Sequence, residues 1–188
     1  MEKTLQNQTS LSRYDNSWYE PGGVVKRLIW YLVSIIFIDT YLPVPMFLKR
    51  LLLKTFGAKI GQNVVLKPKV NIKYPWFLSV GDDTWIGEKV WIDNLTMVNI
   101  GSNVCLSQGC MLLTGNHDFT SARFDLIVKP ITLGNGVWIG AKATVCPGVT
   151  AESHSVLTVN SVATKNMEAY GIYQGNPAEL IKKRQIKH

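Results

Sequence analysis

Large aliphatic residues recur every six positions between residues 60 and 163. The positions on this period are Ile60, Leu66, Ile72, Val80, Ile86, Ile92, Ile100, Leu106, Leu112, Leu133, Ile139, Val145, Ala151, Leu157 and Ala163. A helix would need a period near 3.6 and a simple strand a period of 2. The six-residue period instead predicts a β-helix, in which each hexapeptide makes one short strand and one turn.

A second set of positions follows the same period. Glycine comes directly after the aliphatic residue at positions 61, 81, 87, 101, 134 and 140, and small or β-branched residues occupy most positions three residues further on. We expect the aliphatic side chain to point inward, the small residue to fit a crowded corner and the glycine to relieve backbone strain. Because no single coil can bury its apolar face, stability requires several stacked coils.

The period is interrupted three times, always in the third hexapeptide of a three-hexapeptide coil. The register gains two residues after position 72, two after position 92 and fifteen after position 112. All three insertions should therefore leave the same edge of the prism, and five coils begin at positions 60, 80, 100, 133 and 151. The long insertion, 114–130, is the one large loop, and long loops on rigid scaffolds usually carry function.

The residues before the repeat have a different character. Residues 1–23 are polar and contain Pro21-Gly22-Gly23, which predicts an irregular arm. Residues 24–56 combine large apolar side chains with clustered bases, which predicts one or two short helices. These helices cap the repeat, pack between subunits or lie on an anionic membrane surface. We predict three parts: the arm and helices over 1–57, the β-helix over 58–168 and a C-terminal segment over 169–188.

Composition limits the class of protein. Hydrophobic residues make up 46% of the 188 residues and charged residues 18%, so the chain is too apolar to be disordered. The net charge of +7 suggests an anionic partner, but no nucleic-acid recognition module is present. The three cysteines follow no CxxC spacing, which favours a reducing, cytoplasmic compartment. We see no signal peptide, and the longest apolar run, residues 28–38, is too short to span a bilayer.

Histidine is the residue type on which a catalytic interpretation depends. His154 lies on an outward position of the last coil, where we expect a solvated side chain, and His188 is the terminal residue. His117 opens the long insertion. A loop histidine is either structural or a general base, since the pKa of imidazole lies near neutrality.

Five segments carry a resemblance to a known family. They are Trp91-Ile92-Asp93-Asn94, Thr114-Gly115-Asn116-His117-Asp118, Val137-Trp138-Ile139-Gly140-Ala141, Cys146-Pro147-Gly148-Val149 and Gly175-Asn176-Pro177-Ala178. Over residues 60–184 the chain resembles hexapeptide-repeat acyltransferases with a left-handed parallel β-helix, and among them the sugar O-acetyltransferases of the galactoside, maltose and colanic-acid-biosynthesis types. The resemblance implies an all-β repeat fold, a homotrimer with sites between subunits, and metal-independent transfer of acetyl from acetyl-CoA to a saccharide hydroxyl in exopolysaccharide biosynthesis.

The resemblance also implies roles for single residues. His117 would be the general base that lets the acceptor oxygen attack the thioester directly, and the backbone N–H of Ala141 would stabilise the oxyanion. The segment with Asp93 and Asn94 should stack on the same face as the His117 segment, so we assign both to the catalytic site. Asp93 would orient His117 or hold acceptor hydroxyls, unless it only satisfies a turn N–H. No feature around Cys146 suggests an activated thiolate.

Contacts with acetyl-CoA are implied along the late coils and the C-terminal segment. The residues are Trp138, Ala141, Lys142, Val159, Thr164, Lys165, Pro177, Lys182 and Lys183. Glu179 stands where sugar acetyltransferases commonly have Arg, so the phosphate contacts should shift to Lys182 or Lys183. The competing interpretation of these bases is a solvated tail.

Other functions stay open at this stage. The chain could be an acyltransferase for a non-sugar acceptor, or a non-catalytic β-helix assembly protein that would not need the His117 insertion. A β-helix carbonic anhydrase would need three zinc-binding histidines, and no third ligand stands beside His117 or His154. The basic and apolar residues 24–56 suggest a lipid-linked saccharide and a cytoplasmic protein bound peripherally at the inner face of the membrane.

Overall fold

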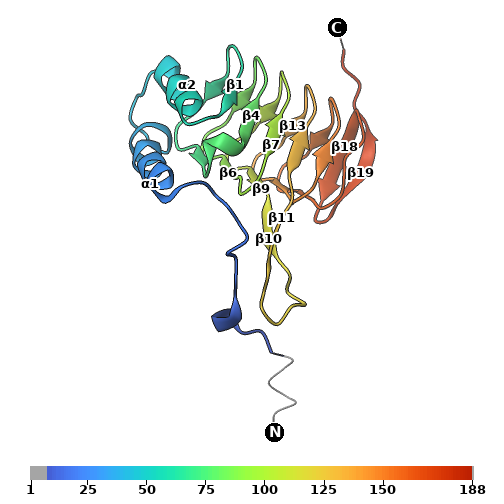
Figure 1. Ribbon diagram of the computed structural model, residues 1–188. Coiled ribbons are helices and arrows are strands. Elements are labelled where there is room, and N and C mark those ends of the chain that lie inside the picture. Colours follow the sequence, from blue (N-terminus) through green and yellow to red (C-terminus); the bar gives the residue numbers. More distant parts are fainter. Residues whose placement is uncertain (1–7, 188) are drawn as a thin grey trace.

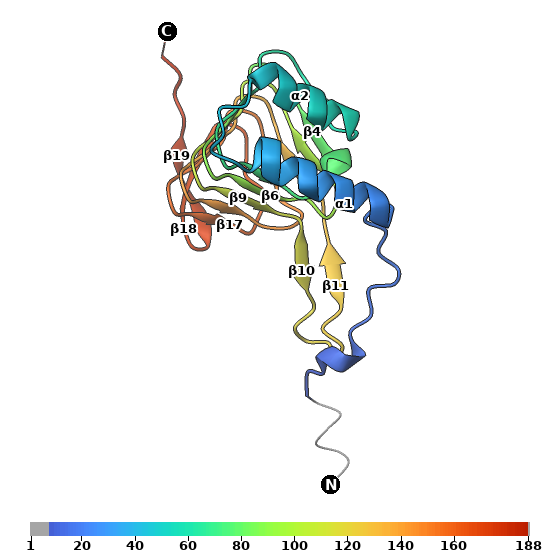
Figure 2. The same ribbon diagram turned by 90° about the vertical axis from the view of Figure 1, so that its left-hand side faces the viewer.

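The computed structural model describes residues 8–187 and contains a stack of β-coils with helices at one end (Figure 1). Viewed along the stack, the coils superpose as a triangular prism (Figure 2). The strands of successive coils pair in parallel, as hexapeptide repeats require. The predicted parallel β-helix with five coils is confirmed.

Three parallel sheets form the faces of the prism. Sheet A contains β1 (Lys59–Ile60), β4 (Leu78–Val80), β7 (Val98–Ile100), β12 (Ile131–Leu133) and β15 (Thr150–Ala151). Sheet B contains β2 (Val65–Leu66), β5 (Trp85–Ile86), β8 (Cys105–Leu106), β13 (Trp138–Ile139), β16 (Val156–Leu157), β18 (Gly171–Gly175) and the antiparallel β19 (Ala178–Lys183). Sheet C contains β3 (Asn71–Ile72), β6 (Trp91–Asp93), β9 (Met111–Leu113), β14 (Thr144–Val145) and β17 (Val162–Ala163).

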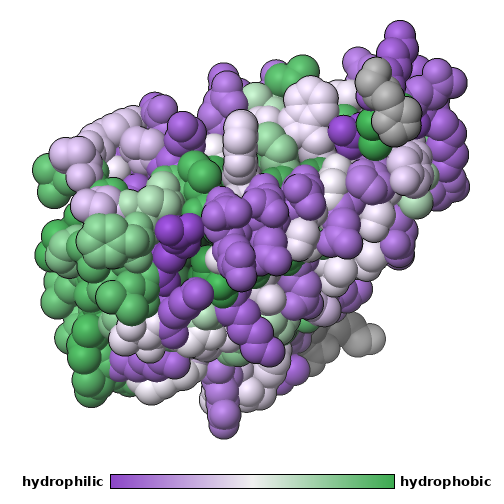
Figure 3. All heavy atoms as spheres, turned by 90° about the horizontal axis from the view of Figure 1, so that it is seen from above, coloured by the Kyte–Doolittle hydropathy of each residue, from purple (hydrophilic) through white to green (hydrophobic). Residues whose placement is uncertain are grey.

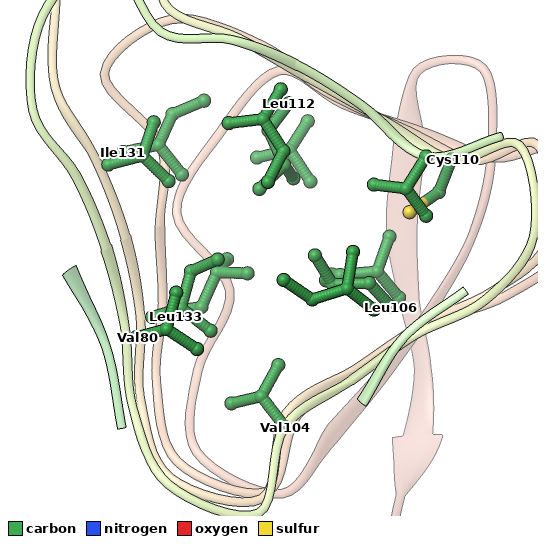
Figure 4. Close-up of a cluster of buried hydrophobic side chains, with 14 of the residues drawn as sticks. Val80, Val104, Leu106, Cys110, Leu112, Ile131 and Leu133 are labelled. Carbon is green, nitrogen blue, oxygen red and sulfur yellow. The ribbon is translucent and has the colours of Figure 1, made fainter. Parts of the chain in front are cut away.

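The core is the interior of the prism. All fifteen positions of the six-residue period are buried, and they stack in rows from coil to coil. In sheet C, for example, Leu112 lies between Ile92 and Val145. Figure 4 shows such rows meeting in the middle of the prism. Each fully buried aliphatic side chain contributes about 1.5–3 kcal/mol to stability, so the repeat itself supplies the core.

The repeat glycines allow close packing of coils rather than relieving backbone strain. Gly140 does not have a positive φ, but a Cβ atom there would lie 2.6 Å from the backbone nitrogen of Val159 in the next coil. The left-handed conformation falls two residues later in the turn, at residues such as Asn63, Asp83 and Asn103. Asn and Asp tolerate that conformation well. Our expectation about the role of these glycines was therefore wrong in its physical cause.

The three insertions leave the same edge of the prism, where sheet C turns into sheet A. The first contains η4 (Pro75–Phe77), and the second hydrogen-bonds to it through Asn94 and Tyr74. The third is not an irregular loop but an antiparallel hairpin of β10 (Gly115–His117) and β11 (Leu126–Val128). This hairpin projects from the prism (Figure 2).

The N-terminal helices cover the open end of the first coil. They are α1 (Val24–Val33), the π-helical turn η3 (Ser34–Ile38) and α2 (Met46–Thr55). The short 3-10 helix η2 (Leu11–Arg13) lies apart from them, in the arm beside the projecting hairpin (Figure 2). Trp30 anchors α1 because its Nε1 donates a 2.9 Å hydrogen bond to the carbonyl of Ile72. Leu53 of α2 is fully buried. No helix within residues 8–187 combines the length and the apolar character needed to cross a membrane.

Candidate active site

His117 ends strand β10 near the base of the projecting hairpin. Its ring stacks on Phe124 with the centroids 4.3 Å apart, and its Nδ1 lies 2.9 Å from the carbonyl oxygen of Phe124. A carbonyl oxygen can only accept a hydrogen bond, so Nδ1 must carry the proton when the imidazole is neutral. Nε2 then keeps a free lone pair, which is what a general base needs.

The hairpin is held in shape by its own polar side chains. Asp118 accepts hydrogen bonds from the hydroxyl and the backbone N–H of Thr120, and these bonds lower the pKa of the Asp118 carboxyl. Ser121 donates to Asp125 at 2.7 Å, and Asp125 also pairs with Arg123. These carboxylates are therefore engaged in shaping the hairpin that carries His117.

Asp93 and Asn94 lie directly beside the origin of the hairpin, because Asp93 pairs in register with Leu113. The carboxylate of Asp93 does not contact His117; its Oδ1 lies 2.9 Å from Nζ of Lys73. Asn94 is fully buried, and its amide bonds to both the N–H and the C=O of Tyr74. The structure thus brings the two residues to the site, Asp93 in an ion pair and Asn94 as an internal brace.

A pocket of about 520 Å³ lies beside His117. We call it the His117 pocket; its walls include Tyr14, Tyr19, Arg27, Lys73, Tyr74, Leu95, His117 and Leu126. Tyr14 and Tyr19 come from the N-terminal arm, which is fastened to the hairpin by a bond from the Ser10 N–H to the Ala122 carbonyl. Tyr19 donates to the Leu95 carbonyl at 2.7 Å, and burial raises the pKa of its phenol.

Sequence reasoning missed this arm as part of the site. The available signal was the concentration of Tyr14, Trp18 and Tyr19 in a segment otherwise expected to be irregular. The positions of Arg27 and Lys73 in the pocket wall could not be read from any motif.

A second groove, of about 430 Å³, runs along the edge where sheet B turns into sheet C. We call it the Trp138 groove; it is lined by Ser107, Gln108, Trp138, Gly140, Ala141, Val156, Leu157, Thr158 and Val159. Trp138 is fixed by a 2.9 Å hydrogen bond from its Nε1 to Ser107. Within residues 8–187 no acceptor binds the N–H of Ala141, so this donor is free at the groove.

No protein-family model matches the chain. The chain is 36% identical over 167 residues to the Escherichia coli (strain K12) protein named colanic acid biosynthesis acetyltransferase WcaF, covering 88% of this chain and 91% of that protein. The chain belongs to the hexapeptide-repeat acetyltransferases. It is therefore an acyltransferase, as predicted.

Solved structures agree with this assignment. A maltose O-acetyltransferase from Clostridium difficile 630 superposes with a TM-score of 0.80 at 22% identity, covering 87% of this chain and 88% of the other. A galactoside acetyltransferase in complex with coenzyme A has a TM-score of 0.69 at 27% identity, with 85% and 80% covered. The left-handed β-helix of the hexapeptide-repeat acetyltransferases is thus the fold of this chain.

The other residues predicted to bind acetyl-CoA fall in three places on this acetyltransferase. Lys142 follows Ala141 at the Trp138 groove, and Pro177 lies in the β18–β19 turn, where Gly175 bonds to Ser161. Thr164 and Lys165 lie instead at the edge between sheets C and A. A single chain therefore does not bring Thr164 and Lys165 together with the Trp138 groove.

Lys182 and Lys183 occupy the far end of β19, opposite Ile172 and Gly171. Lys183 is engaged with Glu168 at 2.7 Å, whereas Lys182 is exposed. The neighbouring Arg184 bonds to the carbonyls of Gly136 and His154, at the edge between sheets A and B. Within one chain, the basic tail and the Trp138 groove thus lie at different edges of the prism.

Within residues 8–187, the other histidine and the cysteines Cys110 and Cys146 provide neither an alternative catalytic residue nor a metal site. His154 is half-buried and stacks on Tyr170, so it is less solvated than expected, and His188 lies outside the described residues. Burial raises the pKa of the Cys110 thiol to about 12 and also raises that of Cys146, which disfavours a thiolate. In the described part of the chain, no three His, Cys, Asp or Glu side chains are grouped to hold a metal ion.

Proposed function

We propose that this protein transfers acetyl from acetyl-CoA to a hydroxyl group of a saccharide, in exopolysaccharide biosynthesis, with His117 as the general base. The observation that carries the proposal is the contact between Nδ1 of His117 and the Phe124 carbonyl. It leaves Nε2 able to take a proton at the wall of a pocket large enough for a sugar. The colanic-acid relative supports the choice of a saccharide acceptor.

The chemical steps use groups already described. Nε2 of His117 takes the hydroxyl proton as the acceptor oxygen bonds to the thioester carbonyl carbon. The N–H of Ala141 donates to the oxyanion that forms. The carbon–sulfur bond then breaks, and the protonated His117 returns the proton to the leaving thiolate, which yields the O-acetyl ester and CoA. Asp93 holds Lys73 at the pocket wall, and Asn94 holds the backbone of Tyr74, another residue of that wall.

The Trp138 groove is our candidate for the acetyl-CoA site, with Trp138, Ala141, Lys142, Val159 and Pro177 along one track. The galactoside acetyltransferase structure with bound coenzyme A supports a coenzyme site on this fold. Thr164 and Lys165 lie at the edge between sheets C and A, and Lys182 and Lys183 lie near the edge between sheets A and B. They would therefore contact a coenzyme in this groove only from a second copy of the chain.

A homotrimer with sites between subunits satisfies this requirement. His117 projects from the edge between sheets C and A, whereas Ala141 lies at the edge between sheets B and C. Direct transfer needs both groups around one thioester, so the His117 of one copy must meet the Trp138 groove of another. The exposed outward row with Trp85 and Trp138 on sheet B supports a subunit contact there.

The helices α1, η3 and α2, which we call the helical cap, support a cytoplasmic enzyme bound peripherally to the inner face of a membrane. Large apolar side chains are exposed along α1, η3 and α2, among them Val24, Leu28, Tyr31, Leu32, Ile35, Ile36, Phe47 and Leu51. Figure 3 shows a hydrophobic area at this end of the molecule. Residues 24–56 also contain five bases and one acid, Asp39, which pairs with Lys69. Apolar area combined with positive charge is the pattern of interfacial helices.

The deciding experiment is an assay of CoA thiol release from acetyl-CoA with a panel of saccharide acceptors. We expect release that depends on the acceptor and on His117. Full turnover by His117→Ala would contradict the assignment of the base, and acceptor-independent release would contradict the transfer reaction.

A further inference from the structure

The His117 pocket is one of two adjoining cavities. The second, of about 500 Å³, lies between the helices α1 and η3 and the first coil, and we call it the helix groove. Arg27, Lys73 and Tyr74 line both cavities. A ligand that fills the His117 pocket and extends beyond it would therefore pass these three residues.

Arg27 is the least satisfied charged group along this path. Its Nε is buried without a hydrogen-bond partner, and no carboxylate among residues 8–187 pairs with its guanidinium. Lys73 is partly exposed, and among the residues that the structure describes its ammonium group forms an ion pair only with Asp93. A buried guanidinium N–H without an acceptor is costly, and phosphate oxygens are the acceptors that arginine binds best.

The far end of the path is apolar. Tyr31 and Ile35 line the helix groove, and they are 60% and 44% exposed. They continue into the exposed apolar side chains of Leu28 and Leu32 on the same helix. Asp39, the acid in the groove, is already paired with Lys69 and Asn71. From His117 outward, the surface is thus polar, then cationic, then apolar.

We propose that Arg27 and Lys73 form a phosphate subsite for an acceptor in which a phosphate or diphosphate joins the sugar to a long apolar chain. The sugar lies in the His117 pocket, the phosphate between Arg27 and Lys73, and the chain in the helix groove against Tyr31 and Ile35. This inference rests on the proposed function, because it uses the His117 pocket as the acceptor site. It adds a phosphate linkage to the lipid-linked saccharide suggested by the sequence, and the residues that would bind each part of it.

The test measures binding without acetyl-CoA, by isothermal titration calorimetry, with farnesyl diphosphate as the probe. Farnesol and inorganic diphosphate each supply half of the probe, and uridine diphosphate represents a soluble phosphate-linked sugar donor. We expect the wild-type protein to bind farnesyl diphosphate about tenfold or more tightly than any of the three. Equal affinity for uridine diphosphate or inorganic diphosphate would overturn the apolar part of the proposal.

Variants distinguish the loss of a positive charge at the subsite from a general loss of stability. Arg27→Gln and Lys73→Gln should each weaken farnesyl diphosphate binding about tenfold, whereas Arg27→Lys should retain most of the binding. Ile35→Ser should weaken the binding of farnesyl diphosphate but not that of inorganic diphosphate. Lys59→Gln, an exposed lysine of the same coil, is the matched control. Unchanged binding by Arg27→Gln and Lys73→Gln, with wild-type melting temperatures, would overturn the subsite.

The two proposals fail in different ways. If farnesyl diphosphate binding depends on Arg27 while His117→Ala keeps full turnover, the phosphate subsite stands and the catalytic assignment is wrong. If His117→Ala loses turnover while binding ignores Arg27, the catalytic assignment stands and the subsite is wrong.

Discussion

Nδ1 of His117 lies 2.9 Å from the carbonyl oxygen of Phe124, and this contact determines which ring nitrogen can accept a proton. The partner is a backbone atom seven residues away on the same hairpin, so the tautomer is set by the hairpin fold rather than by an acidic side chain. We expect His117→Ala to lower kcat by about 100- to 10,000-fold, because the acceptor hydroxyl loses its base.

The measurement is CoA thiol release under saturating acetyl-CoA and acceptor. Acetyl-CoA binding should be retained, since the proposed partner of His117 is the acceptor hydroxyl and the groove residues of the same chain are unchanged. His154→Gln is the control, because His154 stacks on Tyr170 and lines neither the His117 pocket nor the Trp138 groove. A similar loss in both variants would indicate a general effect of histidine replacement and argue against a base at His117.

Val159 tests the coenzyme site. Its side chain is 60% exposed at the Trp138 groove, so Val159→Glu should leave the fold intact while placing a negative charge where acetyl-CoA would lie. We expect KM for acetyl-CoA to rise about tenfold with a smaller change in kcat, which corresponds to about 1.4 kcal/mol. Leu42→Glu, at an equally exposed apolar side chain outside both the Trp138 groove and the basic tail, is the matched control. An unchanged KM in Val159→Glu would place the coenzyme elsewhere.

Replacing Asn94 tests whether its two hydrogen bonds to the Tyr74 backbone stabilise the fold. Asn94→Ala leaves the part-buried N–H and C=O of Tyr74 without their partners, which should cost about 1–1.5 kcal/mol per group. We expect the melting temperature, followed by circular dichroism, to fall by about 4–10 °C. Asn99→Ala removes an exposed asparagine from the neighbouring strand β7 and should have little effect. If the two variants melt alike, the brace contributes nothing.

The helical cap tests membrane binding. Leu28 and Leu32 are 58% and 49% exposed on α1, so replacing both with Gln should not weaken the core. We expect the wild-type protein to float with vesicles of phosphatidylethanolamine and phosphatidylglycerol, and the double variant to lose most of that binding. Ile186→Gln should bind like the wild type. Wild-type protein that stays away from anionic vesicles would exclude the membrane contact.

Lys49 tests the packing of α2 on the first coil. It is only 4% exposed, and burial lowers the pKa of its ammonium group. Between the lowered pKa and the ordinary value of 10.5, the unfolded chain binds more protons than the folded one, so this group adds stability as pH rises through that window.

We therefore expect the free energy of unfolding of the wild type, relative to Lys49→Met, to increase from neutral pH toward pH 10. The measurement is urea unfolding at several pH values, with the exposed Lys59→Met as the control. A difference between wild type and Lys49→Met that does not change with pH would contradict the burial of a charged lysine at this position.

Much of the fold follows from the sequence because the β-helix is built from local repeats. Each inward aliphatic contacts its equivalents one coil above and below, so the six-residue period predicts the rows, the coils and the edge that all insertions share. The same local logic places His117 at the start of the one long insertion, and the resemblance to acyltransferases then made it the candidate base. The role of the repeat glycines was misjudged because the approach of Gly140 to Val159 is a contact between coils, which the period does not reveal.

The tertiary structure decided what the period does not encode. Tyr14 and Tyr19 reach the His117 pocket because the arm runs beside the hairpin, and Arg27 reaches it from helix α1. These contacts join segments about a hundred residues apart that share no pattern. The tertiary structure also shows that Asp93 forms an ion pair with Lys73 and that Asn94 hydrogen-bonds to Tyr74. Such side-chain partners depend on where each side chain points in the folded protein. The sequence by itself thus determined the coiled scaffold, through interactions that repeat locally, and its motifs named a catalytic candidate through resemblance to a family. Only the folded chain determined the pocket around that candidate, because non-repeating segments meet there.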